Sequence, residues 1–106
     1  MKKKIKDLSN KKSKVDDLFL DVNSFLKVIA DDNRLKIVML LKDESMNVTD
    51  IYNKLGIPQN LASHHISKLK SLDLLLEKRN GTFRNYTVNI KKIRQYNVLF
   101  KNLLKL

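Results

Sequence analysis

The fold is decided by residues 47–72, NVTDIYNKLGIPQNLASHHISKLKSL, in which two short amphipathic segments are separated by a tight turn. Asn47 followed three positions later by Asp50 is a variant of the capping box that begins a helix. Gly56 supplies the left-handed conformation that commonly ends one. Only two residues then precede a second helix, predicted over residues 59–72. Two short helices joined by three or four residues that include glycine are typical of a helix-turn-helix.

Two amphipathic helices are expected before this stretch. Apolar residues at i, i+3, i+4 and i+7 predict the first, with one apolar face. That face consists of Val15, Leu18, Phe19, Val22, Phe25, Leu26 and Ile29. Asp31 is a suitable N-cap for the second helix, predicted over residues 32–42. Its inward residues are expected to be Leu35, Val38, Met39 and Leu41.

A β-hairpin and a last helix are expected after it. Strand-like runs at residues 74–79 and 82–88 flank Asn80-Gly81, and Asn-Gly is the strongest short hairpin signal because a type I′ turn needs positive φ at both central residues. Apolar residues from Ile90 onward predict a final amphipathic helix that runs to the end of the sequence. The predicted fold is therefore mainly α with a β-hairpin wing, a winged helix-turn-helix.

Charge is segregated along the chain. Residues 1–14 hold seven Lys and one Asp, a net charge of +6, residues 15–50 have a net charge of −4, and residues 51–106 have a net charge of +9. The basic part favours an anionic partner, which is a nucleic acid, an acidic protein or a lipid surface. Residues 1–14 are predicted to be a basic flexible arm that either contacts phosphates or is a solvated tail, and residues 15–106 the folded domain.

Several functional classes are disfavoured by composition. The sequence has no run of about 18 uncharged apolar residues and no secretory h-region, so a cytoplasmic protein without a membrane span is expected. The absence of cysteine excludes disulfides and thiolate metal ligands. Catalysis is not expected, because there is no Gly-rich phosphate loop and the helical neighbours Ser63 and His64 are poorly placed to act as nucleophile and base. No cofactor is predicted.

The predicted helix 59–72 has two chemically different faces. At about 100° per residue, its apolar face consists of Ala62, Ile66, Leu69 and Leu72. The opposite face is uncharged and can donate or accept hydrogen bonds, which suits base edges in a major groove. It consists of Asn60, Ser63, His64, Ser67 and Ser71. The alternative is an ordinary exposed polar face.

Basic residues flank this helix and occupy the hairpin. Their charge suits the phosphates of a duplex rather than its bases. The predicted phosphate contacts are Lys68, Lys70, Lys78, Arg79 and Arg84.

His64 and His65 are the only histidines of the chain. Adjacent helical side chains diverge by about 100°, so these two cannot chelate one ion as a pair spaced i, i+4 can. His64 is expected to face DNA, and His65 to be partly buried at the edge of the core. No metal site is predicted.

Three stretches resemble the ArsR/SmtB family of winged-helix repressors. Residues 25–38, FLKVIADDNRLKIV, are similar to the family's opening helices, residues 57–69, IPQNLASHHISKL, to its recognition helix, and residues 79–86, RNGTFRNY, to its wing. The resemblance covers about residues 18–90 in one register and implies a homodimeric DNA-binding repressor.

The resemblance also implies residue roles. It places Gln59, Asn60, Ser63 and His64 at positions that contact DNA. It implies a dimer interface formed by the first and last helices, with the interface residues Leu18, Phe19, Val22, Ile93, Phe100, Leu103 and Leu104.

The sequence departs from the family at its sensor sites. Asn47 and Thr49 stand where the best-known metal site has Cys-x-Cys, and residues 89–106 contain neither the Asp nor the His of the other common site. Pro58 replaces the usual capping Ser or Thr. The implied regulator does not sense metals through these sites, and its effector is unknown.

The favoured hypothesis is a sequence-specific regulator, predicted to be a repressor, whose two recognition helices enter successive major grooves of an inverted repeat about 34 Å apart. The alternative is a winged-helix protein–protein interaction module whose basic face binds an acidic partner. Within the first hypothesis, control by abundance, by a competing protein or by an organic ligand is a further option.

Overall fold

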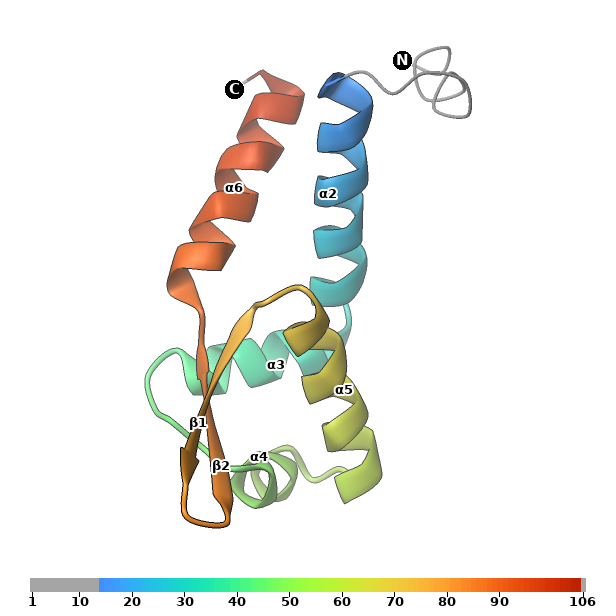
Figure 1. Ribbon diagram of the computed structural model, residues 1–106. Coiled ribbons are helices and arrows are strands. Elements are labelled where there is room, and N and C mark those ends of the chain that lie inside the picture. Colours follow the sequence, from blue (N-terminus) through green and yellow to red (C-terminus); the bar gives the residue numbers. More distant parts are fainter. Residues whose placement is uncertain (1–13, 106) are drawn as a thin grey trace.

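The computed structural model describes residues 14–105, which form five helices and one two-stranded hairpin (Figure 1). Their order is α2 (Lys14–Ile29), α3 (Asp32–Leu41), α4 (Val48–Leu55), α5 (Gln59–Ser71), β1 (Leu75–Asn80), β2 (Phe83–Val88) and α6 (Ile90–Leu104). The predicted winged helix-turn-helix is thereby confirmed. Of the predicted arm 1–14, residues 1–13 lie outside the described residues, and Lys14 begins α2.

The described chain has two parts, which we call the stalk and the head. The stalk consists of α2 and α6, which run side by side in Figure 1 although they stand at opposite ends of the sequence. The rings of Phe25 and Tyr96 join them by stacking, with centroids 4.6 Å apart and an interplanar angle of 9°. The head contains the remaining elements, from α3 to β2.

The hydrophobic core lies in the head. Every element of the head contributes apolar side chains to one buried cluster. It consists of Ile37, Leu41, Met46, Ile51, Ile66, Leu69, Leu74, Leu75, Tyr86 and Val88. By contrast α6, whose residues are all described, contains no buried residue. The buried cluster therefore belongs to the head, and partly buried stalk residues such as Phe25 and Tyr96 pack against it. Other apolar residues of the stalk remain exposed.

The predicted inward face of α3 is wrong at two positions. Leu35 is 46% exposed and Met39 is 56% exposed, whereas Ile37 and Leu41 are buried. At about 100° per residue, the first pair lies opposite the second. The apolar residues of α3 surround the helix, so periodicity does not select a face. Packing against α4, α5 and β2 determines which face of α3 is buried.

The caps that delimit the helix-turn-helix are formed as predicted. The Asn47 side chain accepts a hydrogen bond from the backbone N–H of Asp50 at 2.8 Å. Gly56 has a φ of 66° and ends α4 in the left-handed conformation. Because a Cβ atom disfavours that conformation, glycine allows the sharp turn that leads into α5.

The hairpin turn differs from the prediction by one residue. Asn80 pairs with Phe83, so the two loop residues are Gly81 and Thr82. Of the two, only Gly81 has positive φ, which is the glycine position of a type II′ turn rather than the expected type I′ turn at Asn80-Gly81. The register is fixed near the middle of β2, where Tyr86 and Met46 exchange backbone hydrogen bonds of 2.8 and 3.1 Å. A slip by one residue would expose buried Tyr86.

The packing of α3 can be tested with two truncations on the same helix. Ile37→Ala removes a fully buried side chain and is expected to lower the free energy of unfolding by about 2–5 kcal/mol. Leu35→Ala removes a half-exposed one and is expected to cost less than about 1 kcal/mol. Urea unfolding followed by circular dichroism at one protein concentration measures both. Equal losses would contradict the observed face.

Candidate nucleic-acid interface

The outer face of α5 is exposed over its whole length. Ala62, Ile66 and Leu69 are buried, as predicted for its inner face. All five residues predicted to contact bases are exposed, namely Gln59, Asn60, Ser63, His64 and Ser67. Their side chains are therefore available to a ligand, and their contact with DNA remains a prediction.

Both ends of α5 are fixed by backbone geometry. Pro58 provides no side-chain cap, but its carbonyl accepts from the N–H of Ala62 at 3.1 Å. At the other end, Asp73 has a φ of 57°, a conformation that aspartate adopts more readily than most residues. Its carbonyl accepts from the side chain of Asn89 at 2.9 Å. Helix α5 is thus joined to the start of the wing through a short, hydrogen-bonded connection.

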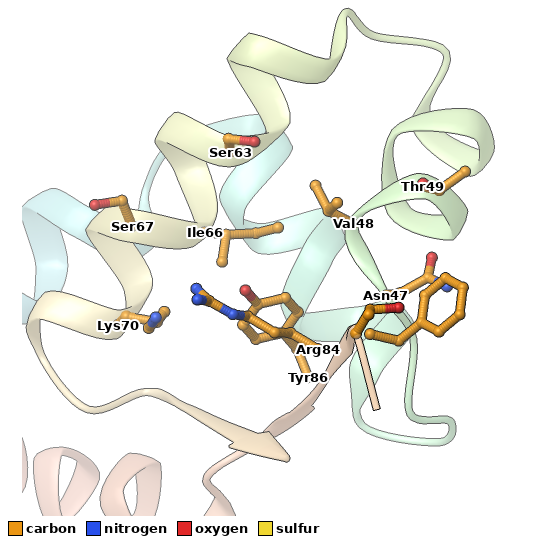
Figure 2. A pocket seen from close by; sticks show the side chains of 11 residues that line it. Asn47, Val48, Thr49, Ser63, Ile66, Ser67, Lys70, Arg84 and Tyr86 are labelled. Atoms are coloured by element: carbon orange, nitrogen blue, oxygen red, sulfur yellow. The ribbon is translucent and has the colours of Figure 1, made fainter. Parts of the chain in front are cut away.

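A groove of about 420 Å³ runs between α5, the N-terminus of α4 and the wing (Figure 2). In Figure 2, Ser63 and Ser67 line it from α5, and Lys70 and Arg84 lie at one end of it beside Tyr86. The groove brings the predicted base-contacting hydroxyls and a wing cation to one surface. The full lining is Asn47, Val48, Thr49, Ser63, Ile66, Ser67, Lys70, Thr82, Phe83, Arg84 and Tyr86.

Sequence reasoning missed the contribution of α4 and Phe83 to this groove. The sequence pattern marks Asn47 as a capping residue, and the family resemblance marks Asn47 and Thr49 as positions that lack the usual metal ligands. Phe83, near the wing tip, is 62% exposed, which is unusual for so large an apolar side chain. The position of Phe83 close to the turn glycine is the sequence signal that could have predicted its contribution to the groove.

The wing presents a concentrated positive charge. Lys78, Arg79 and Arg84 are all exposed, as expected for residues that contact phosphates. Arg79 and Arg84 are directly opposite each other across the hairpin. Like charges in such a pair repel, and an anion bound between them would relieve that repulsion. The wing is therefore electrostatically suited to a phosphate.

Lys70 differs from the other predicted phosphate contacts because it already has an anionic partner. Its ammonium nitrogen donates to Oε1 of Glu77 at 2.9 Å and lies 5.8 Å from the ring centroid of Tyr86. This hydrogen bond lowers the pKa of the Glu77 carboxyl, while burial and the Glu77 charge raise the pKa of Tyr86. Lys70 therefore links α5 to the wing. Lys68, two positions earlier on α5, is exposed.

The two histidines point in different directions. His64 is exposed as predicted, while His65 is 4% exposed and thus more deeply buried than predicted. Their ring centroids are 6.0 Å apart and the planes are tilted by 58°. Burial is the main cause of a lowered pKa for His65. Within residues 14–105, no three His, Cys, Asp or Glu side chains form a group that could hold a metal ion.

The predicted dimer residues differ in accessibility. Val22 is 1% exposed within the single chain, which leaves no surface for a partner, so its assignment to the interface is corrected. Leu104 is 48% exposed. The others, Leu18, Phe19, Ile93, Phe100 and Leu103, are half-buried. On α2 and α6, the exposed apolar residues that the prediction left out of the interface are Val15, Leu20, Leu26, Ile90 and Val98. Among the helices of the described residues, none is both long and apolar enough to cross a membrane.

Comparison with known proteins identifies relatives of this arrangement. The family model described as "bacterial regulatory protein, arsR family" matches residues 31–76. The transcriptional repressor SdpR of Bacillus subtilis is 35% identical over 68 residues, which cover 64% of this chain and 76% of SdpR. The transcriptional repressor PagR of Bacillus anthracis is 36% identical over 74 residues, 69% of this chain and 74% of PagR.

Two further proteins are similar in sequence or in fold. The cadmium resistance regulatory protein CadC of Listeria innocua is 36% identical over 72 residues, and the match spans 60% of its length. A solution structure from Mycobacterium bovis, described as a homodimeric winged helix-turn-helix DNA-binding domain, is 25% identical with a TM-score of 0.70. The alignment covers 85% of this chain and 84% of that one.

These relatives agree with the geometry of the head. The matched residues run from the N-cap of α3 into β1 and so include the whole helix-turn-helix. The family consists of DNA-binding transcriptional regulators, which confirms both that class and the expectation that the chain is not an enzyme. We conclude that the chain belongs to the ArsR family of winged helix-turn-helix transcriptional regulators.

Proposed function

We propose that this chain is a transcriptional repressor that binds an inverted-repeat operator as a homodimer. The observation that carries the proposal is the exposed, uncharged, hydrogen-bonding face of α5, which shares a groove with the cationic wing. The relatives SdpR and PagR are named as repressors, which supports the direction of regulation.

The base-reading surface is proposed to be Gln59, Asn60, Ser63, His64 and Ser67. Amide, hydroxyl and imidazole groups can donate to or accept from base edges, and a helix fits the major groove, about 12 Å wide. No acidic residue lies between Gln59 and Ser71 to repel a duplex. This surface would therefore supply sequence preference.

The residues that contact phosphates are proposed to be Lys68, Lys78, Arg79 and Arg84. Contacts to phosphates release condensed counterions, so the affinity is expected to fall steeply with salt. Lys70 is proposed to act mainly through Glu77, because its ammonium group already pairs with that carboxylate at 2.9 Å.

The stalk is proposed to be the dimer interface. Its helices leave apolar side chains exposed, and contiguous exposed apolar surface is typical of interaction sites. The similar M. bovis domain is homodimeric. A symmetric dimer would set two recognition helices about 34 Å apart, one helical turn of DNA. Residues 15–106 are proposed to form the single DNA-binding and dimerisation domain, without metal sensing through the usual family sites.

The binding proposal is tested by selecting duplexes from a random library with the full chain at moderate salt. We expect an inverted repeat whose half-sites lie about 10 base pairs apart, centre to centre. Recovery of unrelated sequences alone would contradict the proposal and favour a basic module that binds an acidic protein.

Substitution of a base-contacting residue and substitution of a phosphate-contacting residue are expected to affect DNA binding in different ways. Ser63→Ala is expected to reduce discrimination between the selected duplex and a scrambled one by about 1–3 kcal/mol per lost base contact. Arg84→Ala is expected to weaken both duplexes alike and to reduce the salt slope by about one for each lost phosphate contact. Fluorescence anisotropy over a series of KCl concentrations measures both quantities.

The matched control is Lys101→Gln, which removes one positive charge from the far part of α6 and should change neither quantity by much. Uniform weakening by Ser63→Ala with unchanged discrimination would rule out direct readout by α5.

Dimerisation through the stalk is tested by Leu104→Asp. A carboxylate is costly to bury, so this change is expected to raise the dimer dissociation constant by at least about tenfold. Met39→Asp, at an exposed apolar position of α3 outside the stalk, is the control and should leave the dimer intact. Sedimentation velocity reports the species. A monomeric parent chain, or a larger effect at Met39, would contradict the assignment.

A further inference from the structure

One side chain, that of Arg34, joins three helices. The backbone N–H of Arg34 in α3 donates to the carboxylate of Asp31 at 3.0 Å. Its side-chain Nε donates to the carbonyl oxygen of Val28 at 2.6 Å, close to the end of α2. Its Nη1 lies 3.3 Å from Nδ1 of His65 on the inner side of α5. The arginine therefore connects the stalk to the buried side of the recognition helix.

The contact between Arg34 and His65 requires a neutral imidazole. A guanidinium group has donors only, so Nδ1 of His65 must be the acceptor, and the ring hydrogen is then on Nε2. His65 is 4% exposed, and in the described part of the chain its Nε2 has no hydrogen-bond partner. Protonation of His65 at Nδ1 would place an N–H donor opposite the N–H donor of Arg34. It would also bring two cations, the imidazolium and the guanidinium, side by side.

Three charged or titratable groups surround the His65 ring. The Asp31 carboxylate, at 3.8 Å from Nδ1, favours the protonated ring, whereas Arg34 and the neighbouring His64 oppose it. Burial is the largest influence and lowers the pKa of His65. The hydrogen bond from the N–H of Arg34 lowers the pKa of Asp31, so that carboxylate stays charged. A protonated ring therefore has Asp31 as an alternative partner to Arg34.

We infer that Arg34 is a positioning residue that couples the stalk to the recognition helix, and that protonation of His65 breaks this coupling and weakens operator binding. The inference rests on the proposed DNA-binding function. His65 and the proposed DNA-contacting His64 are consecutive on α5. A change in the position of His65 in the core therefore also moves the outer face of the helix.

His64 is the second histidine of the chain and lies on the proposed DNA-contacting face. The variant His64→Asn therefore leaves His65 as the one histidine whose response to acid is measured.

The test measures operator affinity by anisotropy from about pH 8 to about pH 4.5 at constant ionic strength, a range that extends below the ordinary titration of histidine because burial lowers the pKa of His65. In His64→Asn, affinity is expected to fall by at least roughly threefold across this range, since proton linkage allows up to tenfold per pH unit for one group. In the double variant His64→Asn/His65→Asn, the amide oxygen introduced in place of the buried imidazole supplies an acceptor that does not titrate. The profile of the double variant should then be flat.

Three outcomes decide the matter. An acid-induced fall that persists in the double variant, or a flat profile in His64→Asn, overturns the inference while leaving the proposed function intact. If the parent chain does not bind the operator at any pH, both fail. Circular dichroism at each pH confirms that the variants remain folded.

A second measurement does not depend on DNA. Long-range ¹H–¹⁵N correlation spectra at about pH 8 are expected to show the Nε2–H tautomer for His65. The Nδ1–H tautomer would overturn the inference. Arg34→Lys keeps the charge but loses the planar fork, so it is expected to weaken operator binding severalfold without dissociating the dimer. Unchanged operator affinity in this variant would contradict the positioning role.

Discussion

The packing of α5 against the core of the head is the interaction on which the rest of the structure depends. Ala62, Ile66 and Leu69 are buried on one side of the helix, so the residues about 180° away must face solvent. The same packing of the apolar face therefore exposes the polar side chains. Packing energy, supplied by apolar burial, orients the surface that we propose reads DNA.

The head and the stalk divide two tasks between them. The head contains the buried cluster and can hold the groove between α5, α4 and the wing in a fixed shape. The stalk leaves apolar residues exposed on both of its helices. Arg34 bridges these parts through Val28 and His65, so a change in stalk geometry has a short physical route to the recognition helix.

Much of the fold could be predicted because its signals are local. The cap at Asn47, the left-handed Gly56 and the two faces of α5 depend on residues only a few positions apart. The misses involve long-range contacts. The face of α3 is chosen by its neighbours, the hairpin register by Met46 and Tyr86, and the pairing of Lys70 by Glu77 on the wing. The contact of Arg34 with His65 spans 31 positions, and no sequence period reveals it.

The most direct test of the central claim is to titrate isotope-labelled protein with its selected duplex and to follow backbone amide shifts. We predict that the largest perturbations fall on residues 59–67 of α5 and on the wing around Arg79 and Arg84, with small changes along α6. Perturbations concentrated on the stalk, or on the exposed α3 face at Leu35 and Met39, with α5 unaffected, would contradict it.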